Sequence, residues 1–408
     1  MWERLFDRML RNHVQHAHIK IRMPSGVQIG YGPGPDTGLS IAIKDTATLR
    51  QILTAPELGI GEAYMDGRLL IENDDLDGFM RFISRNADTA PLGGLHAVSR
   101  WLGQVRRRID QRNPVRRARA NVAHHYDLSA ALYDLFLDRD RQYSCAYFSR
   151  PGMDLEDAQA AKKAHIARKL ILEPDMEVLD IGCGWGGMAL TLARDYGVRV
   201  WGVTLSEEQH RIALSRAAKA GLSDRVRFEL RDYRDIDRSF DRVVSVGMFE
   251  HVGVPHYPEY FDKLRRLLRP EAVALIHTIG RSGPPGHTSP WVAKYIFPGG
   301  YVPALSEMSA AIEGAGLINT DTEVWRLHYA ETLKIWHDRF VARESEACAL
   351  YDGRFCRMWR YYLKACEYSF RLRGHVVFQV QFAQAQSAVP LTRDYLYPAA
   401  QHHLSAAE

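Results

Sequence analysis

The sequence predicts an α/β fold with a mostly parallel β-sheet, preceded by a small α+β domain. Three observations support this prediction. Runs typical of strands and of helices alternate from residue 178 to residue 279, and such alternation indicates parallel strands covered by helices on both faces. A glycine-rich turn follows the first apolar strand of this series. Upstream, residues 18–85 contain short strand-like runs around a Gly/Pro turn and then helical segments.

Length and composition restrict the class of protein. A chain of 408 residues is long enough for two domains, and 46% hydrophobic with 25% charged residues is typical of a globular protein, which excludes a disordered or fibrous chain. No uninterrupted apolar run reaches the length that spans a bilayer, and the first residues include acids and lack the apolar core of a signal peptide. We therefore expect a cytoplasmic location.

The cysteines and the charges give further expectations. The five cysteines lie far apart, without a C-x-x-C pair, so we expect free thiols. The net charge is only +4, but eight arginines and a single acid, Asp110, lie between Arg100 and Arg119. Such a run is found in solvated linker helices, on surfaces that bind anionic lipid and in nucleic-acid-binding proteins. Nucleic acid is disfavoured as a partner, because no basic sheet or recognition helix accompanies the run.

The first residues predict an amphipathic helix. Residues 1–12 place apolar side chains at helical spacing with charged residues between them, and this helix either packs on its own domain or lies on a bilayer. His13, His16 and His18 follow at a spacing that could bind a metal, but no Cys or carboxylate joins them. A strand over residues 18–23 accounts for them more simply, and we expect no metal site.

The remainder of the N-terminal region predicts an accessory domain. Strands are expected over residues 27–31 and 39–43, a helical part begins near Thr48, and a helix is expected over residues 70–82. No catalytic constellation is present in this region. We expect residues 1–95 to form the accessory domain, 96–120 a basic linker, and 121–408 the larger α/β domain.

The stretch from Asp180 to Gly187 predicts a ligand site. Its glycines, spaced G-x-G-x-G, lie between a buried strand and a helix over residues 188–196. Glycines allow a tight turn and the close approach of a ligand, and the helix offers free backbone N–H groups. The next strand ends in Thr204, without the acid that binds the ribose of a dinucleotide. S-adenosylmethionine (SAM) is therefore favoured over NAD, and a plain strand–helix turn without a ligand remains the alternative.

Polar residues follow three more strands of the series. These strand ends contain Asp232, Glu250 and His277, and ligands of parallel sheets bind at the carboxyl ends of the strands. Taken singly, Asp232 is also explained as a helix cap, Glu250 as a surface charge and His277 as a core residue. Together they predict a small-molecule site in one crevice.

The C-terminal part predicts a cover for this crevice. The Gly/Pro-broken, aromatic segment over residues 296–308 is interpreted as a lid. Two helices follow, over residues 329–345 and 355–371, and the second carries a stripe of apolar and aromatic side chains on one face. Such a stripe is usually core, but here it could also line a tunnel for an acyl chain.

Several motifs along the chain resemble those of a known family. The sequence is similar to the cyclopropane-fatty-acyl-phospholipid synthases, SAM-dependent enzymes that include the mycolic acid cyclopropane synthases. The motifs that carry the resemblance are His125-Tyr126-Asp127, residues 143–148 (YSCAYF), residues 180–187 (DIGCGWGG), residues 204–209 (TLSEEQ), residues 232–235 (DYRD), residues 249–253 (FEHVG), residues 277–280 (HTIG) and, in the accessory domain, residues 61–67 (GEAYMDG). The resemblance implies a Rossmann-like SAM-dependent methyltransferase domain.

The resemblance also implies site residues. SAM is expected to be held by Tyr143, Ser144, Asp180, Gly182, Cys183, Gly184, Trp185, Gly186, Thr204, Leu205, Ser206, Gln209, Asp232 and Tyr233. A bicarbonate ion is expected to be held by Cys145, Glu250, His277, a backbone group of Ile279, and Tyr329. Cys366 matches a cysteine proposed as catalytic in the family; it is kept among the catalytic candidates, although a thiol has no evident step to perform and tunnel lining explains it as well.

The implied reaction adds a methylene group from SAM to the cis double bond of an unsaturated phospholipid acyl chain, with bicarbonate as the general base. The aromatic faces of Tyr143, Tyr147 and Phe148 are expected to stabilise the carbocation. Two alternatives remain: a related methyltransferase that makes a methyl-branched acyl chain, and a lipid-binding protein with a dead site. The resemblance further implies that residues 1–95 dock on lipid, that the protein contacts the inner face of the membrane peripherally, and that it forms a homodimer.

Overall fold

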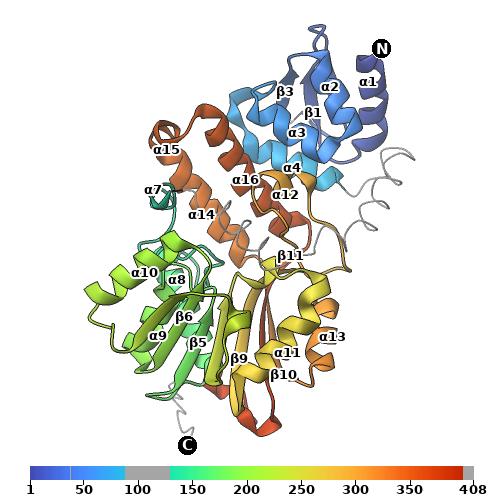
Figure 1. Cartoon of the computed structure of the whole chain (residues 1–408). Coiled ribbons are helices and arrows are strands. Elements are labelled where there is room, and N and C mark those ends of the chain that lie inside the picture. Colours follow the sequence, from blue (N-terminus) through green and yellow to red (C-terminus); the bar gives the residue numbers. More distant parts are fainter. Residues whose placement is uncertain (37, 88–128, 398–408) are drawn as a thin grey trace, which may run out of the picture.

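The structure is a computed structural model that describes residues 1–36, 38–87 and 129–397 (Figure 1). Two β-sheets organise this part of the chain: a four-stranded sheet in the order β2-β1-β3-β4 and a seven-stranded sheet in the order β10-β11-β9-β8-β5-β6-β7. The predicted basic linker, the arginine run and the His125-Tyr126-Asp127 motif all fall within residues 88–128, outside the described residues.

The four-stranded sheet belongs to the N-terminal region, at the top of Figure 1. Its elements are α1 (Trp2–His13), β1 (Ile19–Arg22), β2 (Gln28–Tyr31), β3 (Ser40–Ile43), α2 (Thr46–Thr54), α3 (Pro56–Met65), β4 (Leu69–Ile71) and α4 (Leu76–Asn86). Phe6 and Leu10 of α1 are buried in the core of this region, whereas Leu5 is 42% exposed. The amphipathic helix therefore packs its apolar side on its own domain.

The expected helix over residues 70–82 is partly wrong. Residues Leu69–Ile71 instead form β4, which pairs antiparallel with β3. A short 3-10 turn (Glu72–Asp74) follows, with Asn73 at a positive φ of 55°. The helix α4 begins only at Leu76, because the side chain of Asp75 caps it by accepting a hydrogen bond from the backbone N–H of Gly78.

The seven-stranded sheet confirms the predicted fold class. Its strands are β5 (Glu177–Ile181), β6 (Arg199–Thr204), β7 (Val226–Leu230), β8 (Phe240–Val246), β9 (Leu268–Arg281), β10 (Ile318–Trp325) and β11 (His375–Ala383). The five strands from β5 to β9 are parallel, and β11 lies antiparallel between β9 and β10. The sheet is thus mostly parallel, and its two last strands were not predicted.

Helices cover both faces of this sheet. One apolar cluster joins the sheet to α11 (Tyr257–Leu267) and α13 (Leu305–Gly314). Another joins it to α8 (Leu155–Leu170), α9 (Gly187–Tyr196) and α10 (Glu207–Lys219). The short elements are α7 (Ala130–Tyr133) and the 3-10 turns η2 (Tyr233–Asp235), η3 (Phe249–His251), η4 (Val254–His256), η5 (Gln386–Ala388) and η6 (Asp394–Leu396).

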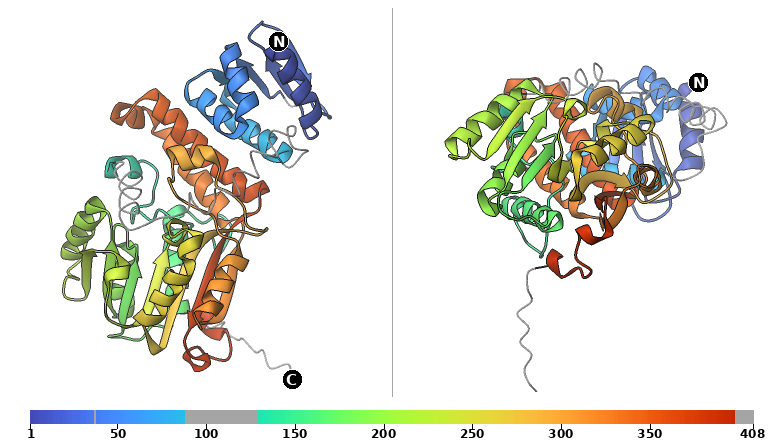
Figure 2. Two further views of the ribbon diagram at one scale, coloured as in Figure 1. Left: turned by 45° about the vertical axis from the view of Figure 1, so that its right-hand side comes forward. Right: turned by 60° about the horizontal axis from the view of Figure 1, so that its bottom comes forward.

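A helical layer connects the two sheets. The helices α14 (His328–Ala342), α15 (Glu344–Leu350) and α16 (Gly353–Leu372) lie between the N-terminal region and the seven-stranded sheet in Figures 1 and 2. The short helix α12 (Pro290–Tyr295) packs against α3. There, Glu62 accepts hydrogen bonds from Lys294 (2.6 Å) and Tyr295 (2.7 Å). The GEAYMDG motif of α3 thus contacts the segment that precedes the expected lid.

The prediction of five free thiols is wrong for one pair. Cys348 on α15 and Cys356 on α16 form a disulfide, which sequence spacing did not indicate because the pair is joined only by the packing of two helices. Cys145, Cys183 and Cys366 are free. Among the described residues, the helices are all too short or too polar to cross a bilayer.

Candidate active site

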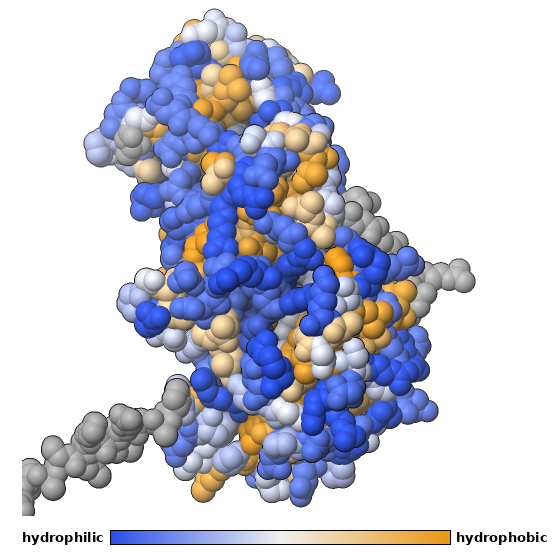
Figure 3. Space-filling model, turned by 90° about the vertical axis from the view of Figure 1, so that its left-hand side faces the viewer, coloured by the Kyte–Doolittle hydropathy of each residue, from blue (hydrophilic) through white to orange (hydrophobic). Residues whose placement is uncertain are grey.

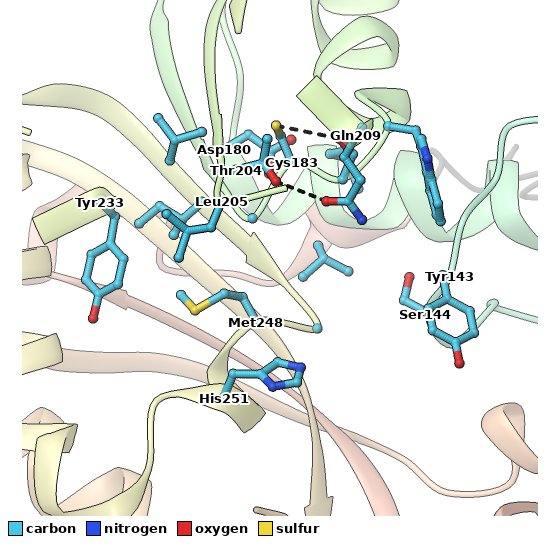
Figure 4. Close-up of a pocket in the computed structure, with 18 of the residues that line it drawn as sticks. Tyr143, Ser144, Asp180, Cys183, Thr204, Leu205, Gln209, Tyr233, Met248 and His251 are labelled. Carbon is cyan, nitrogen blue, oxygen red and sulfur yellow. Dashed lines mark hydrogen bonds between the residues drawn. The ribbon is translucent and has the colours of Figure 1, made fainter. Parts of the chain in front are cut away.

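A cavity of about 1290 Å³, partly open to solvent, lies at the carboxyl ends of β5, β6 and β8 (Figure 4). Parallel sheets place their ligand sites at this edge. Tyr143 and Ser144 lie on one side of the cavity and Tyr233 lies on the other. Met248 and His251, which follow β8, form part of the wall between them.

The turn between β5 and α9, beside the cavity, depends on glycine. Gly182 has a φ of +81°, and a Cβ at this position would lie 3.0 Å from the Cβ of Met248. Gly186 has a φ of +83°, and a Cβ there would lie 2.6 Å from the ring of Phe228. Both residues combine a left-handed backbone with a close neighbour, and only glycine tolerates that combination.

Twelve of the fourteen residues expected to hold SAM line this cavity, and Gly186 and Ser206 do not. Gly186 instead allows the chain to enter α9 against Phe228. Ser206 caps α10 by accepting from the backbone N–H of Gln209 (3.3 Å). Thr204 donates from its hydroxyl to Oε1 of Gln209 (3.0 Å), which leaves the amide nitrogen of Gln209 for a ligand.

The two acids of this cavity have different surroundings. Asp180 is 2% exposed, and burial raises its pKa to about 7. Its Oδ2 has no hydrogen-bond partner in the described part of the chain. Asp232, in contrast, forms an ion pair with Arg234 (2.8 Å) and caps the turn η2. Asp180 is therefore the acid with an oxygen left over for a ligand.

A second cavity of about 670 Å³ adjoins the first and shares Tyr143, Ser144, Gly247 and His251 with it. All five residues expected to hold bicarbonate line this second cavity: Cys145, Glu250, His277, Ile279 and Tyr329. The sequence places them on separate elements, and the structure brings them together. Cys366 lines neither cavity, and burial raises the pKa of its thiol to about 12, which fits a packed, neutral side chain.

Glu250 is held by one of its two oxygens. Its Oε1 accepts a hydrogen bond from the backbone N–H of Ile279 (2.8 Å), so that N–H orients the carboxyl group. Its Oε2 is buried and has no partner among the described residues. Burial raises the pKa of Glu250 to about 7. This carboxyl group is therefore poised to change its charge near neutral pH.

His277 is neutral and has a defined tautomer. Burial lowers its pKa well below the usual value. The amide nitrogen of Gln379 on β11 lies 3.1 Å from its Nδ1, and because that amide donates, Nδ1 accepts and the ring proton is on Nε2. Nε2 is buried and has no partner in the described chain. Cys145 donates its thiol to the carbonyl of Ala146 (3.3 Å), and burial raises its pKa, so it stays protonated.

These groups fit a small anion that carries a hydroxyl. Nε2–H of His277 is a donor and Oε2 of Glu250 is an acceptor when ionised, and both are buried without partners in the described structure. Unpaired buried polar atoms are costly unless a ligand or water pairs with them. Bicarbonate has both an oxygen to accept and an O–H to donate, so it matches this pair.

Sequence reasoning missed some residues of the site. His251 lines both cavities, and burial lowers its pKa to about 4. The FEHVG motif and the polar strand end both contained His251, next to Glu250 in the turn η3, but no site role was expected for it. The expected lid contributes Phe297, Gly300 and Tyr301 to the second cavity. Of the three aromatic residues expected around the cation, Tyr143 lines both cavities, whereas Tyr147 and Phe148 line neither of the two and stack on His328.

A family model described as mycolic acid cyclopropane synthetase matches residues 113–380. The chain belongs to this family. Family membership, together with its relatives of known name, makes it a SAM-dependent methyltransferase, as the sequence predicted. The match spans both cavities and the helices α14 and α16.

Relatives of this family cover most of the chain. A "Cyclopropane-fatty-acyl-phospholipid synthase" of Escherichia coli (strain K12) is 40% identical over 344 residues, 84% of this chain and 87% of the relative. A "Probable fatty acid methyltransferase" of Pseudomonas putida is 35% identical over 400 residues, 94% of this chain and 97% of the relative.

Solved structures of the family agree with the catalytic part. The Mycobacterium tuberculosis cyclopropane synthase MmaA2 is 32% identical, with a TM-score of 0.63, over 67% of this chain and 99% of that one. The mycolic acid cyclopropane synthase CmaA1, solved with S-adenosylhomocysteine (SAH) and CTAB, is 33% identical, with a TM-score of 0.62, over 67% of this chain and 99% of that one.

Proposed function

We propose that the protein is a cyclopropane-fatty-acyl-phospholipid synthase that transfers a methylene group from SAM to the cis double bond of unsaturated phospholipid acyl chains. The observation that carries the proposal is the junction of the two cavities. Tyr143 and Ser144 line both, so a ligand of the glycine turn and an anion between Glu250 and His277 meet at one wall. The E. coli relative bears this name and is 40% identical.

The residues of the first cavity position the methyl donor. SAM supplies the electrophilic methyl group to the alkene. Asp180 offers a hydrogen-bond acceptor and Gln209 a donor to the polar groups of SAM. The glycine turn lets SAM approach the backbone closely. Because an alkene is a weak nucleophile, holding the two groups in line supplies much of the rate increase. The aromatic walls, Tyr143, Phe297 and Tyr301, exclude water, which would trap a cation.

The residues of the second cavity hold the proton acceptor. Bicarbonate supplies an acceptor for the proton that the transferred methyl group loses as the ring closes. Nε2–H of His277 orients an oxygen of the anion, and ionised Glu250 accepts its hydroxyl proton. No side-chain carboxylate then needs to approach the cation directly.

Product analysis tests the proposal. The protein is incubated with SAM and vesicles of unsaturated phospholipid, and the acyl chains are examined by mass spectrometry. We expect a gain of one CH2 per modified chain together with upfield cyclopropane methylene signals in the proton NMR spectrum. Unchanged acyl chains, under conditions where SAH binding is measured and saturated, would refute it.

A methyl-branched product is the second candidate. It needs the same cavities and differs only in the fate of the cation. The P. putida relative and the "Tuberculostearic acid methyltransferase UfaA1" of M. tuberculosis, each 35% identical over 90% or more of this chain, carry methyltransferase names. The same NMR experiment separates the candidates, because a methyl branch gives no upfield methylene signal.

We further propose that the protein works at the inner membrane surface as a peripheral homodimer, with residues 1–95 and the basic run as docking elements. The face in Figure 3 is mostly hydrophilic with separate apolar patches. The arginine run over residues 100–119 makes charge the stronger candidate for attraction. Binding to anionic vesicles is therefore expected to weaken as salt rises, because salt screens exposed charges over about 10 Å or less. Cosedimentation measures this, and salt-independent binding would contradict it.

A further inference from the structure

Lys162 is a buried lysine that is not among the residues of the proposed reaction. It lies on α8 and is 0% exposed. Its Nζ donates to Oε1 of Gln142 (2.7 Å) and to Oγ of Ser144 (2.8 Å). One turn earlier on the same helix, the amide of Gln159 donates to the backbone carbonyls of Gln142 (3.1 Å) and Ser144 (2.9 Å). The helix is therefore hydrogen-bonded to the loop on both sides of Tyr143.

This loop, residues 142–145, forms the wall that the two cavities share. Gln142, Tyr143 and Ser144 line the larger cavity, and Tyr143, Ser144 and Cys145 line the smaller one. A displacement of this loop would move the groups on the methyl-donor side and those on the proton-acceptor side together. Lys162 is therefore placed behind the one segment on which both halves of the site depend.

A purely structural role would not favour a lysine here. No carboxylate in the described part of the chain forms an ion pair with Lys162, and both of its partners are neutral. Burial lowers its pKa to about 7, and the charge of Asp138 opposes that shift. An unpaired buried ammonium group destabilises a fold, and such costs are commonly retained where activity needs them.

Lys162 also determines what the Ser144 hydroxyl can do. Because Oγ of Ser144 accepts a hydrogen bond from the ammonium group, the hydroxyl proton must point elsewhere, and Ser144 faces both cavities. A hydroxyl that accepts from a cation is also a stronger donor.

We propose that Lys162 is a positioning residue of the methyl-donor site: it fixes the 142–145 loop and orients the Ser144 hydroxyl as a hydrogen-bond donor toward the bound methyl donor. This inference rests on the proposed SAM site, but not on the identity of the lipid product. Its partner is the polar, amino-acid end of the SAM molecule or of its product SAH.

A double-mutant cycle tests the inference through SAH binding, measured by calorimetry. Lys162→Met keeps the length of the side chain and removes the donors; we expect SAH to bind about tenfold more weakly, the usual scale for one charge-assisted hydrogen bond. Ser144→Ala is expected to weaken binding by a similar factor. The double variant should be no weaker than Ser144→Ala alone, because both changes remove one interaction.

Thermal unfolding separates positioning from simple support. Lys162→Met should unfold at the same or a higher temperature than the wild type, since it removes an unpaired buried charge. The matched control is Lys169→Met, on the same helix and equally buried, whose ammonium pairs with Asp321 (3.0 Å) and Glu323 (2.6 Å). It should unfold at a lower temperature and bind SAH as the wild type does.

Two results would overturn the inference. One is wild-type SAH affinity in Lys162→Met; the other is additive losses in the cycle, which would mean that Lys162 and Ser144 act separately. If Lys162→Met did not fold, Ser144→Ala would still decide, because wild-type SAH affinity in that variant excludes a donating hydroxyl. A wild-type protein that binds SAH but leaves the acyl chains unchanged would instead refute the proposed function and leave this inference standing.

Discussion

Glu250→Gln is expected to lower kcat about 1000-fold, within the range that a lost acid–base group commonly costs. Glutamine keeps the size of the side chain and an oxygen for the backbone N–H of Ile279, which now bonds Oε1 at 2.8 Å. It replaces the unpartnered Oε2 by an amide that cannot accept a proton. The anion would lose its acceptor, while the glycine turn and its ligand would stay as they are.

SAH affinity and stability show whether this loss is specific. Binding of SAH should equal that of the wild type, and the Tm above pH about 7 should be equal or higher, because the variant has no buried carboxylate to ionise. Glu271→Gln is the matched control: the same change at an exposed position of β9 should leave kcat unchanged. A Glu250→Gln enzyme within about threefold of the wild type would remove Glu250 from the proposed chemistry.

The pH dependence of kcat depends on the same carboxyl group. Burial raises the pKa of Glu250 to about 7, so below that pH the group is protonated and cannot accept the hydroxyl proton of the anion. At saturating SAM, kcat should therefore rise as pH increases through about 7. Two other buried groups have a pKa of about 7, Asp180 and Lys162. The midpoint should persist in Asp180→Asn and in Lys162→Met, and its disappearance in either variant would assign it to the residue changed there.

Gly61→Ala is expected to lower activity on phospholipid vesicles about tenfold through the contact between α3 of the N-terminal region and α12, the helix that precedes the expected lid. A Cβ at Gly61 would lie 2.4 Å from the indole ring of Trp291, which is 2% exposed. Relieving that overlap costs about 1–3 kcal/mol and pushes α3 away from α12. Because Val292 and Phe297 line the second cavity, the shift would reach the groups that hold the proton acceptor.

Two quantities are measured for each variant: the turnover rate on phospholipid in vesicles, and the affinity for SAH by calorimetry. SAH affinity should be unchanged, since the first cavity lies against other elements. Gly314→Ala adds the same methyl group to a helix, at a position with nothing within 4 Å, and should behave as the wild type. Equal turnover in both glycine variants would show that the α3–α12 contact has no part in catalysis.

The fold class was predictable because its signal is local. The parallel strands contain apolar runs, β5, β6 and β8 are each followed by an α-helix before the next strand, and glycines mark the turn after β5. The accessory sheet was also visible, except where residues 69–71 pair with β3 instead of starting a helix. That choice depends on a partner strand distant in the sequence, which no local pattern reveals.

The site was predictable in its residues but not in its arrangement. The resemblance pointed to Glu250 and His277. The structure shows that both line one cavity and that each has one buried polar atom without a hydrogen-bond partner among the described residues. Gln379, which selects the tautomer of His277, lies on β11, a strand that was not predicted. Lys162 and His251 were missed for a similar reason: their contacts arise only when separate elements pack together.

In the proposed reaction, one site transfers the methyl group of SAM and then removes a proton from it. SAM with a fully deuterated methyl group tests this directly, with the acyl product analysed by mass spectrometry. We expect each modified chain to retain two of the three deuterons, as a ring methylene, because the third leaves to the acceptor beside Glu250 and His277. Products that retain all three deuterons would contradict it.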